Sequence, residues 1–182
     1  MMRNKKNTLL DKATELFAQG GYTAVGIDRI IAEAGVAKMT MYKHFPSKQH
    51  LILAVLQERD HTFRASLKAY VEQYNTPLEK VRAVFAWHGE WFQRPDFSGC
   101  MFINASAEFH DSTTEIHQAA AHHKQLLIRY LETLLHETYP STAKQLAKQL
   151  SILLDGAIVA AHVTGNRNAA VDAWEIAALF IQ

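Results

Sequence analysis

The chain has 182 residues, of which 48% are apolar, and it carries a formal net charge of +1 and a single cysteine. A chain of this length and composition can bury a core, which argues against disorder. The single cysteine excludes an intrachain disulfide, and no uninterrupted apolar run reaches the ~18 residues that a membrane-spanning helix needs. We therefore expect a cytoplasmic protein without membrane association.

The charge is unevenly distributed along the chain. Residues 1–48 contain eight Lys and Arg against four Asp and Glu, a net charge of +4, whereas the remainder has eleven against fourteen, a net charge of −3. A basic N-terminal part on an acidic body predicts contact with nucleic acid at one end only.

The N-terminal part predicts three helices. The first runs from about Lys6 to Gln19 and ends at Gly20-Gly21. Apolar residues at helical spacing in 27–34 predict a second helix of about two turns, and Gly35 follows where the chain must turn. A third short helix is rich in basic and hydroxyl residues and is stopped by Pro46. Two short helices across a tight turn indicate a helix-turn-helix whose second helix enters the major groove of DNA.

Several residues at fixed spacing in about 8–56 form a recognisable pattern. They are Gly21-Tyr22, Ile30, Ala34-Gly35-Val36, Lys38-x-Thr40-x-Tyr42-x-His44-Phe45 and Ser47-Lys48. This pattern resembles the TetR family of bacterial transcriptional regulators. The resemblance implies an all-α fold of about nine helices, with a three-helix DNA-binding domain at 1–48 and a helical effector-binding and dimerisation domain at 49–182.

The same resemblance implies which side chains contact DNA. Thr40, Tyr42, His44 and Lys48 match positions that contact the DNA backbone in the family. Lys38, Met39 and Lys43 lie where a recognition helix meets base edges, with Lys38 as a donor to guanine and Met39 as an apolar contact. For Tyr42 the alternative is packing in the core, which is what we expect of Phe45.

The body is predicted to be helical throughout, since no strand pattern is present. A long helix from about Ser47 to Tyr74 follows the first three, and Thr76-Pro-Leu-Glu79 is a capping box that begins the next. A second capping box is predicted at Ser112-Thr-Thr-Glu115. The remaining helices are expected at about Gly99–Phe109, Thr113–Glu137, Thr142–Val163 and Arg167–Ile181.

Aromatic residues are dense in the middle of the chain, where the family encloses an effector pocket. The resemblance implies a small, largely apolar ligand with one or two polar anchors. The candidate lining is Trp87, Trp91, Phe97, Met101, Asn104 and Glu108. An ordinary packed core is the alternative for these residues.

Other chemistry finds little support. The histidines between His110 and His123 lack the i,i+3 or i,i+4 spacing of a metal site, and Cys100 on an apolar helix fits a buried, inert thiol. No hydrolase, phosphate-loop or dinucleotide motif is present. We therefore predict no catalytic residue, no metal and no cofactor.

The last two predicted helices carry apolar and small residues that allow close helix approach. In the family such helices form the dimer interface, so we expect a homodimer on a near-palindromic DNA operator. The predicted function is a transcriptional repressor that a small-molecule effector releases. The alternatives are an activator without an effector, and an enzyme that acts on a small molecule in a regulator-like fold.

Overall fold

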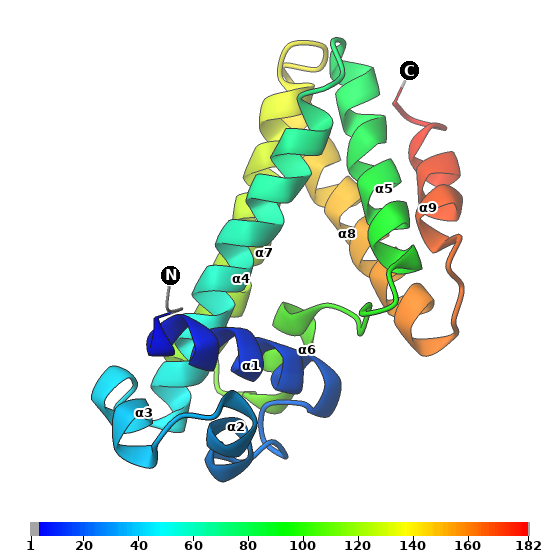
Figure 1. Cartoon of the computed structure of the whole chain (residues 1–182). Coiled ribbons are helices and arrows are strands. Elements are labelled where there is room, and N and C mark those ends of the chain that lie inside the picture. The colour runs from blue at the N-terminus through cyan, green and yellow to red at the C-terminus, as the bar shows by residue number, and fades with distance from the viewer. Residues whose placement is uncertain (1–3, 182) are drawn as a thin grey trace. The chain divides into compact units, whose positions relative to one another are not determined.

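Every regular element between residues 4 and 181, the part of the chain that the computed structural model describes, is an α-helix (Figure 1). The predicted all-α fold with nine helices is confirmed over this range. The helices are α1 (Lys5–Gly20), α2 (Ile27–Ala34), α3 (Lys38–His44), α4 (Lys48–Val71), α5 (Pro77–Gln93), α6 (Met101–Glu108), α7 (Glu115–Leu135), α8 (Ala143–Val163) and α9 (Ala169–Ala177).

Short polar side chains begin several of these helices. The Asn4 side chain accepts the backbone N–H of Lys6 at 3.1 Å, which caps α1. The predicted capping box of α5 is present, because Thr76 Oγ1 accepts the Glu79 N–H at 3.3 Å while the Glu79 carboxylate accepts the Thr76 N–H at 3.0 Å. Ser47 accepts the N–H of His50 at 3.3 Å and caps α4.

The start of α7 differs from the prediction. The helix begins at Glu115 rather than Thr113, and the residues before it form a turn. The Asp111 carboxylate holds this turn, since it accepts the backbone N–H of Thr113 at 2.9 Å and its hydroxyl at 2.7 Å. Thr114 then accepts the N–H of His117 at 3.4 Å, so the first turn of α7 is capped by Thr114 instead of Ser112.

Packing divides the described chain into two compact units. Unit 1 comprises the residues up to His61 together with Met101–His122, and unit 2 comprises Thr62–Cys100 and the residues from His123 onward. The division differs from the expected boundary after residue 48, because α6 and the first half of α4 belong to the same unit as the helix-turn-helix. The Tyr22 hydroxyl, for example, donates to the Met101 carbonyl at 3.0 Å.

Unit 1 has its own apolar core. The side chains of Phe17 and Tyr22 are buried and their rings lie 5.2 Å apart. Helices α1, α2 and α3 contact one another in this unit. Further buried side chains come from α1, α2, α3 and the first half of α4, namely Leu9, Leu16, Ile30, Met41, Leu51, Ile52, Val55 and Leu56.

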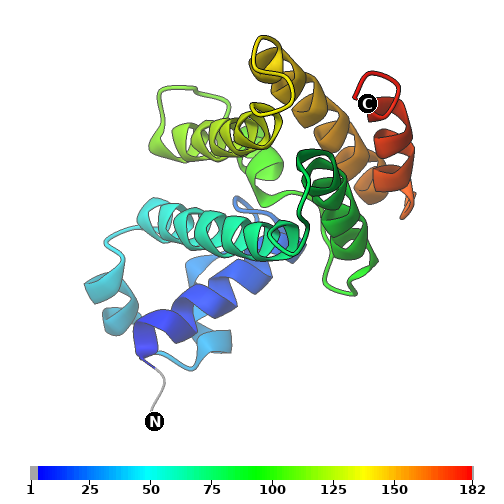
Figure 2. The ribbon, with the colours of Figure 1, turned by 90° about the horizontal axis from the view of Figure 1, so that it is seen from above.

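Unit 2 is built on α5, α8 and α9. Each of these helices contacts the other two, and the view from above shows α9 beside α8 (Figure 2). Small residues make this close approach possible, since Ala157, Ala161, Ala170, Ala173 and Ala177 are all buried. Aromatic residues of α5 add to this core, since the rings of Trp87 and Trp91 lie 4.7 Å and 5.3 Å from that of Phe63 on α4.

Helix α8 is long and rich in apolar residues. By length and composition alone this helix of 21 residues could cross a membrane, and 39% of its apolar stretch is buried. Polar residues interrupt the apolar positions of α8, so a search for uninterrupted apolar runs does not find this candidate. The buried part is the alanine-rich face of α8 that packs in unit 2, as a core helix of a water-soluble protein also would.

Candidate DNA interface

The turn between α2 and α3 has the geometry of a helix-turn-helix. Gly35 adopts a left-handed conformation, with φ of 62°, at the end of α2. Its N–H bonds to the Ala32 carbonyl at 3.3 Å, and the Val36 N–H bonds to Ile31 at 3.2 Å. The Val36 side chain is buried. This cap ends α2 and lets α3 begin at Lys38.

Helix α3 buries one face and exposes the other. Met41 is fully buried and Phe45, directly after the helix, is 3% exposed, so the prediction that Phe45 packs in the core is confirmed. Met39 on the opposite face is 82% exposed and Tyr42 is 41% exposed. These two residues share a face because they are three positions apart. The core alternative for Tyr42 is therefore wrong.

The exposed face of α3 carries the kinds of side-chain group that bind DNA. Met39, Thr40, Tyr42 and Lys43 together line one surface hollow. They present a thioether, two hydroxyl groups and an ammonium group. Hydroxyl and ammonium groups bind phosphates, and an apolar side chain packs against a thymine methyl. His44 is half-buried at the end of the helix, with its ring 6.4 Å from that of Phe45.

The ammonium group of Lys38 has an ion-pair partner on the neighbouring helix. Its Nζ lies 2.9 Å from the Asp28 carboxylate on α2, and both side chains are largely exposed. The hydrogen bond to Asp28 raises the pKa of Lys38 above its ordinary value. Exposed pairs of this kind are weak. To reach a base, the ammonium group must exchange this carboxylate for the acceptor on DNA.

Lys48 lies at the first position of α4 and bonds within the protein. Its Nζ donates to the carbonyl of Thr23 at 3.0 Å. Partial burial lowers the pKa of Lys48, although the nearby Glu108 carboxylate opposes this shift. An ammonium group has three donors, so this bond leaves two N–H groups for a phosphate. The Thr23 contact also fixes where the ammonium group lies.

Two family models match this chain. A family model described as "Bacterial regulatory proteins, tetR family" matches residues 9–55, and one described as "Tetracyclin repressor-like, C-terminal domain" matches residues 77–177. The chain belongs to the TetR family. It is therefore a DNA-binding transcriptional regulator of the helix-turn-helix type.

Individual relatives agree with this assignment. The crystal structure of SCO4454, a TetR-family transcriptional regulator from Streptomyces coelicolor, is 32% identical, covers 96% of this chain and 92% of its own, and has a TM-score of 0.90. The regulator YuxN of Bacillus subtilis is 25% identical over 158 residues, which is 85% of this chain and 53% of YuxN. The activator FasR of Mycolicibacterium smegmatis is 35% identical over 79 residues, 43% of this chain and 36% of FasR. The chain thus spans about half the length of YuxN and about a third of the length of FasR.

Glu108 on α6 forms hydrogen bonds to the segment before the TetR helix-turn-helix. The sequence did not predict these contacts. The Glu108 carboxylate accepts the backbone N–H of Tyr22 at 2.9 Å and that of Thr23 at 2.6 Å. Gly21 precedes them with φ of 78°, and a Cβ there would lie 2.9 Å from Glu108 Oε1. The glycine thus provides both the backbone conformation and the space for the carboxylate.

The environment of Glu108 keeps it charged. Burial alone would raise its pKa, but hydrogen bonds from Thr23 and Tyr22, with Lys48 nearby, outweigh burial and hold the pKa below its ordinary value. The Glu108 carboxylate is thus an acceptor for two backbone N–H groups, and its predicted place in the wall of an effector pocket stays a prediction. The only sequence signal for this contact is the Gly20-Gly21-Tyr22 segment.

The other residues predicted to line a pocket are divided between the two units. Trp87, Trp91 and Phe97 belong to unit 2, and Met101 and Asn104 belong to unit 1. Trp91 packs edge-on against Phe97 at 5.0 Å between ring centroids, and both tryptophans are at most 5% exposed. These contacts are those of a packed aromatic core, so a pocket role for these residues stays a prediction.

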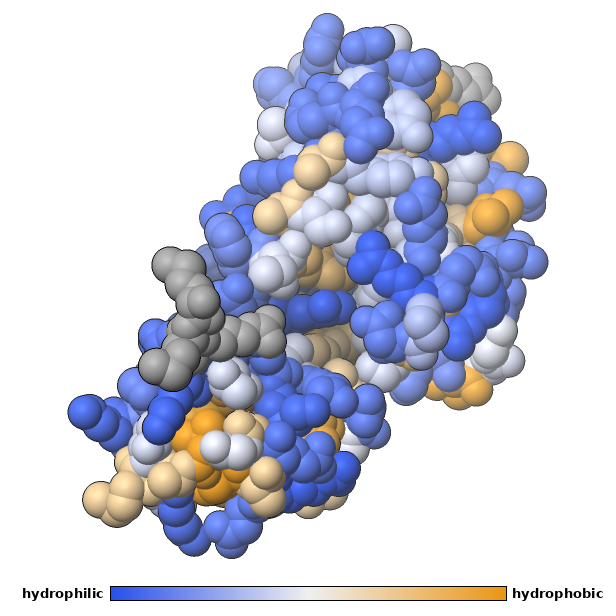
Figure 3. All heavy atoms as spheres, viewed as in Figure 1, coloured by the Kyte–Doolittle hydropathy of each residue, from blue (hydrophilic) through white to orange (hydrophobic). Residues whose placement is uncertain are grey.

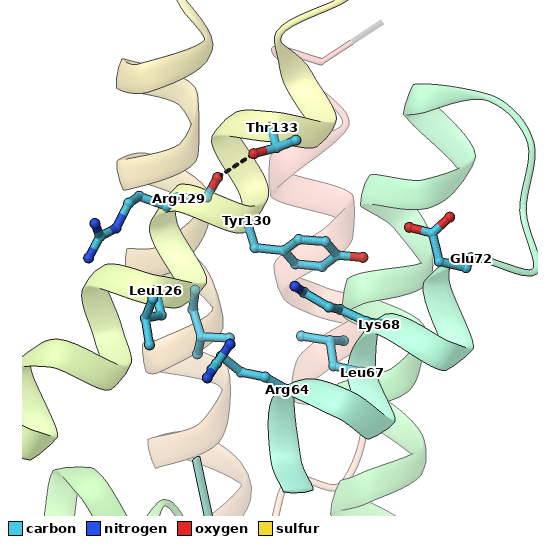
Figure 4. Close-up of a pocket in the computed structure, with 9 residues that line it drawn as sticks. Arg64, Leu67, Lys68, Glu72, Leu126, Arg129, Tyr130 and Thr133 are labelled. Atoms are coloured by element: carbon cyan, nitrogen blue, oxygen red, sulfur yellow. Dashed lines mark hydrogen bonds between the residues drawn. The ribbon is translucent and has the colours of Figure 1, made fainter. Parts of the chain in front are cut away.

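Unit 2 contains a cavity with a different lining. It has a volume of about 340 Å³ and lies between the second half of α4 and α7 (Figure 4). Three leucines form apolar walls and four charged residues line it, together with Tyr130 and Thr133. The sequence reading missed this cavity, because its polar and apolar residues come from two helices some 60 positions apart in the chain.

The described residues contain no group of three or more His, Cys, Asp and Glu side chains arranged to hold a metal ion. His117 Nδ1 donates a hydrogen bond to the Phe109 carbonyl at 2.8 Å. Cys100 is buried.

Proposed function

We propose that this TetR-family protein is a homodimeric repressor that leaves a near-palindromic operator when a small, largely apolar molecule binds. The observation that best supports this proposal is the exposed face of α3. Met39, Tyr42 and Lys43 are exposed on this helix, whereas Met41 is buried in the core. Thr40, Tyr42, His44 and Lys48 then contact the DNA backbone, and Lys38, Met39 and Lys43 meet the bases.

The homodimer is supported by apolar surface on α8 and α9. Ile152 and Val163 on α8 are 71% and 72% exposed, and Val159 lies on the same face because 152, 159 and 163 follow helical spacing. Val171 and Ile176 on α9 are also exposed. Figure 3 shows apolar residues at the edge of unit 2 that α9 forms. A second copy of the chain would cover this surface, which also accounts for the high hydropathy of α8 without a membrane.

The dimer sets the form of the operator. Two copies related by a two-fold axis present two α3 helices, so the two half-sites are inverted repeats about one helical turn of DNA apart. Release follows from a population shift, since a ligand that binds one conformation of unit 2 more tightly favours that conformation. Helices α4 and α7 each contribute residues to both units. A change of conformation in unit 2 is therefore transmitted to unit 1 along these two continuous helices. We place the protein in the cytoplasm, where its operator is.

The test is a selection of DNA sites. Purified protein is mixed with a random duplex library at fixed salt, and the bound duplexes are amplified and sequenced. We expect enrichment of one near-palindromic site. A folded protein that enriches no site at low salt would refute a DNA-binding function.

The direction of regulation needs a second measurement. FasR is named a transcriptional activator, so a reporter gene placed behind the selected operator separates repression from activation. Repression in the absence of effector is the expected result. Turnover of a small molecule by the pure protein would instead favour the enzyme alternative.

A further inference from the structure

The cavity of unit 2 has an amphipathic lining that the predicted effector pocket did not include. Its volume of about 340 Å³ lies within the range of about 300–1,000 Å³ that is typical of small-molecule sites. Leu67 on α4 and Leu126 and Leu127 on α7 give it apolar walls. A ligand that fills it must therefore have an apolar part.

The charged groups around these walls are mainly cationic. Arg64 and Lys68 come from α4 and Arg129 from α7, whereas Glu72 is the single acid in the lining (Figure 4). The Glu72 carboxylate already pairs with Lys80 at 3.2 Å. Because the Glu72 carboxylate is already paired, the ammonium group of Lys68 and the guanidinium group of Arg129 bring positive charge to the cavity, which favours an anion.

A buried hydroxyl group completes the site. The Tyr130 hydroxyl oxygen is buried and has no hydrogen-bond partner, the only such side-chain atom found among the described residues. Figure 4 shows its ring extending from α7 toward α4, and Lys68 Nζ lies 5.4 Å from the ring centroid. Burial, reinforced by Glu72, raises the pKa of Tyr130 to about 12, so the group keeps its proton at neutral pH. An unpartnered buried donor is unfavourable unless a ligand accepts its hydrogen bond.

We propose that this cavity binds an amphipathic anion, an oxyanion joined to an apolar chain. The Tyr130 hydroxyl donates a hydrogen bond to the oxyanion, and Lys68 and Arg129 supply the opposite charge. Leu67, Leu126 and Leu127 contact the chain. As the effector of a regulator this ligand class rests on the proposed function, but binding itself does not depend on it.

The test uses calorimetric titration of the purified full chain with four probes. Octanoate and octyl phosphate combine an oxyanion with an eight-carbon chain, octanol has the chain without the charge, and acetate has the charge without the chain. We expect octanoate or octyl phosphate to bind at least tenfold more tightly than octanol and acetate, and the tighter of the two identifies the head group. Equal affinity for octanol, or no binding of either anion, would overturn the proposal.

Substitutions locate the binding in this cavity. Lys68→Gln and Tyr130→Phe should each weaken binding of the preferred anion at least fivefold, whereas Lys148→Gln, on the exposed surface of α8 outside the cavity, should leave the affinity unchanged. Tyr130→Phe should also keep or raise the melting temperature of the ligand-free protein, because it removes an unpartnered buried hydroxyl. Binding that none of the cavity substitutions weakens would place the ligand elsewhere and overturn the assignment.

The two proposals fail in different ways. Operator binding by the ligand-free protein tests the proposed function alone, and the titration tests the cavity alone. A protein that binds its operator but neither anion overturns only the ligand assignment. Binding of the anion by a protein that selects no DNA site overturns only the proposed regulatory function.

Discussion

The Glu108 carboxylate on α6 accepts the backbone N–H of Thr23 at 2.6 Å, in the segment that connects α1 to α2. These residues are 85 positions apart, and the contact joins α6 to the helix-turn-helix within unit 1. The Thr23 carbonyl in turn accepts Lys48 Nζ from the start of α4. One backbone residue thus connects α6 and α4 through two charged side chains. Any shift of α6 acts directly on the segment before the DNA-binding helices.

Substitution of Glu108 should loosen this connection. Glu108→Ala removes an acceptor that serves two backbone N–H groups, so we expect a loss of about 1–3 kcal/mol in the free energy of unfolding and weaker operator binding. Glu108→Gln retains one neutral acceptor and should lose less. Urea titration followed by circular dichroism measures the effect. Glu115→Ala, an exposed acid at the start of α7, is the control and should change stability little; an equal loss in both variants would argue against the contact.

The free energy of unfolding should depend on pH through the protonation of His88. Burial lowers the pKa of this fully buried imidazole from 6.5 to about 4. The unfolded chain therefore takes up a proton below pH 6.5 while the folded chain does not, so stability is fully present above pH 6.5 and decreases as pH falls toward 4. A shift of this size corresponds to a loss of roughly 3 kcal/mol.

The His88 prediction is checked by thermal unfolding between pH 7 and pH 4.5. The wild-type melting temperature should fall over this interval, and His88→Gln should show a smaller fall. His122→Gln, which removes an exposed histidine, should behave as wild type. An unchanged slope in the His88 variant would assign the pH dependence to other groups.

Asp28 should limit the affinity for DNA. It pairs with Lys38 at 2.9 Å on the surface that we propose contacts the operator, so Asp28→Asn releases the ammonium group and removes a negative charge. We expect operator binding to tighten by about two- to tenfold at low salt and less at high salt, where charges are screened. Fluorescence anisotropy measures this. Asp96→Asn in the exposed loop after α5 should have no effect, and tighter binding by that variant would point to net charge alone.

The double substitution Tyr42→Phe with Lys48→Ala should weaken binding to specific and nonspecific duplexes alike. Both residues are assigned to phosphates, and loss of one cationic contact reduces the slope of log K against log salt by about 1. Titrations at several salt concentrations give the slope, and Lys144→Ala on α8 is the control. A slope equal to that of the wild type would refute the phosphate role of Lys48.

The exposed face of α8 should be essential for dimerisation. Ile152→Glu combined with Val163→Glu places two charges where apolar side chains are more than 70% exposed, so the folded chain should persist as a monomer with at least tenfold weaker operator binding. Light scattering after size exclusion gives the mass. Leu78→Glu on α5, also an exposed apolar residue, should remain dimeric. A double variant that stays dimeric would exclude this face as the interface.

Much of the fold could be read from the sequence because its signals are local. Apolar spacing and glycine stops located the nine helices, and Thr76 with Glu79 formed the predicted cap. The family resemblance implied which residues of α3 contact DNA, and the sequence placed Phe45 in the core, where it is buried together with Met41 four positions earlier. The start of α7 was misplaced because Asp111, a nearby acceptor, competed with the predicted cap.

The sequence by itself determined the helical pattern and the TetR resemblance, because helical periodicity and a motif at fixed spacing are both local features of the chain. Only the tertiary structure decided that Glu108 holds the Thr23 backbone, that Lys38 pairs with Asp28, and that Tyr130 is left without a partner in a cationic cavity. Each of these depends on which distant side chains meet when the helices pack. Helical periodicity specifies the face on which a side chain lies, but not the residue opposite it.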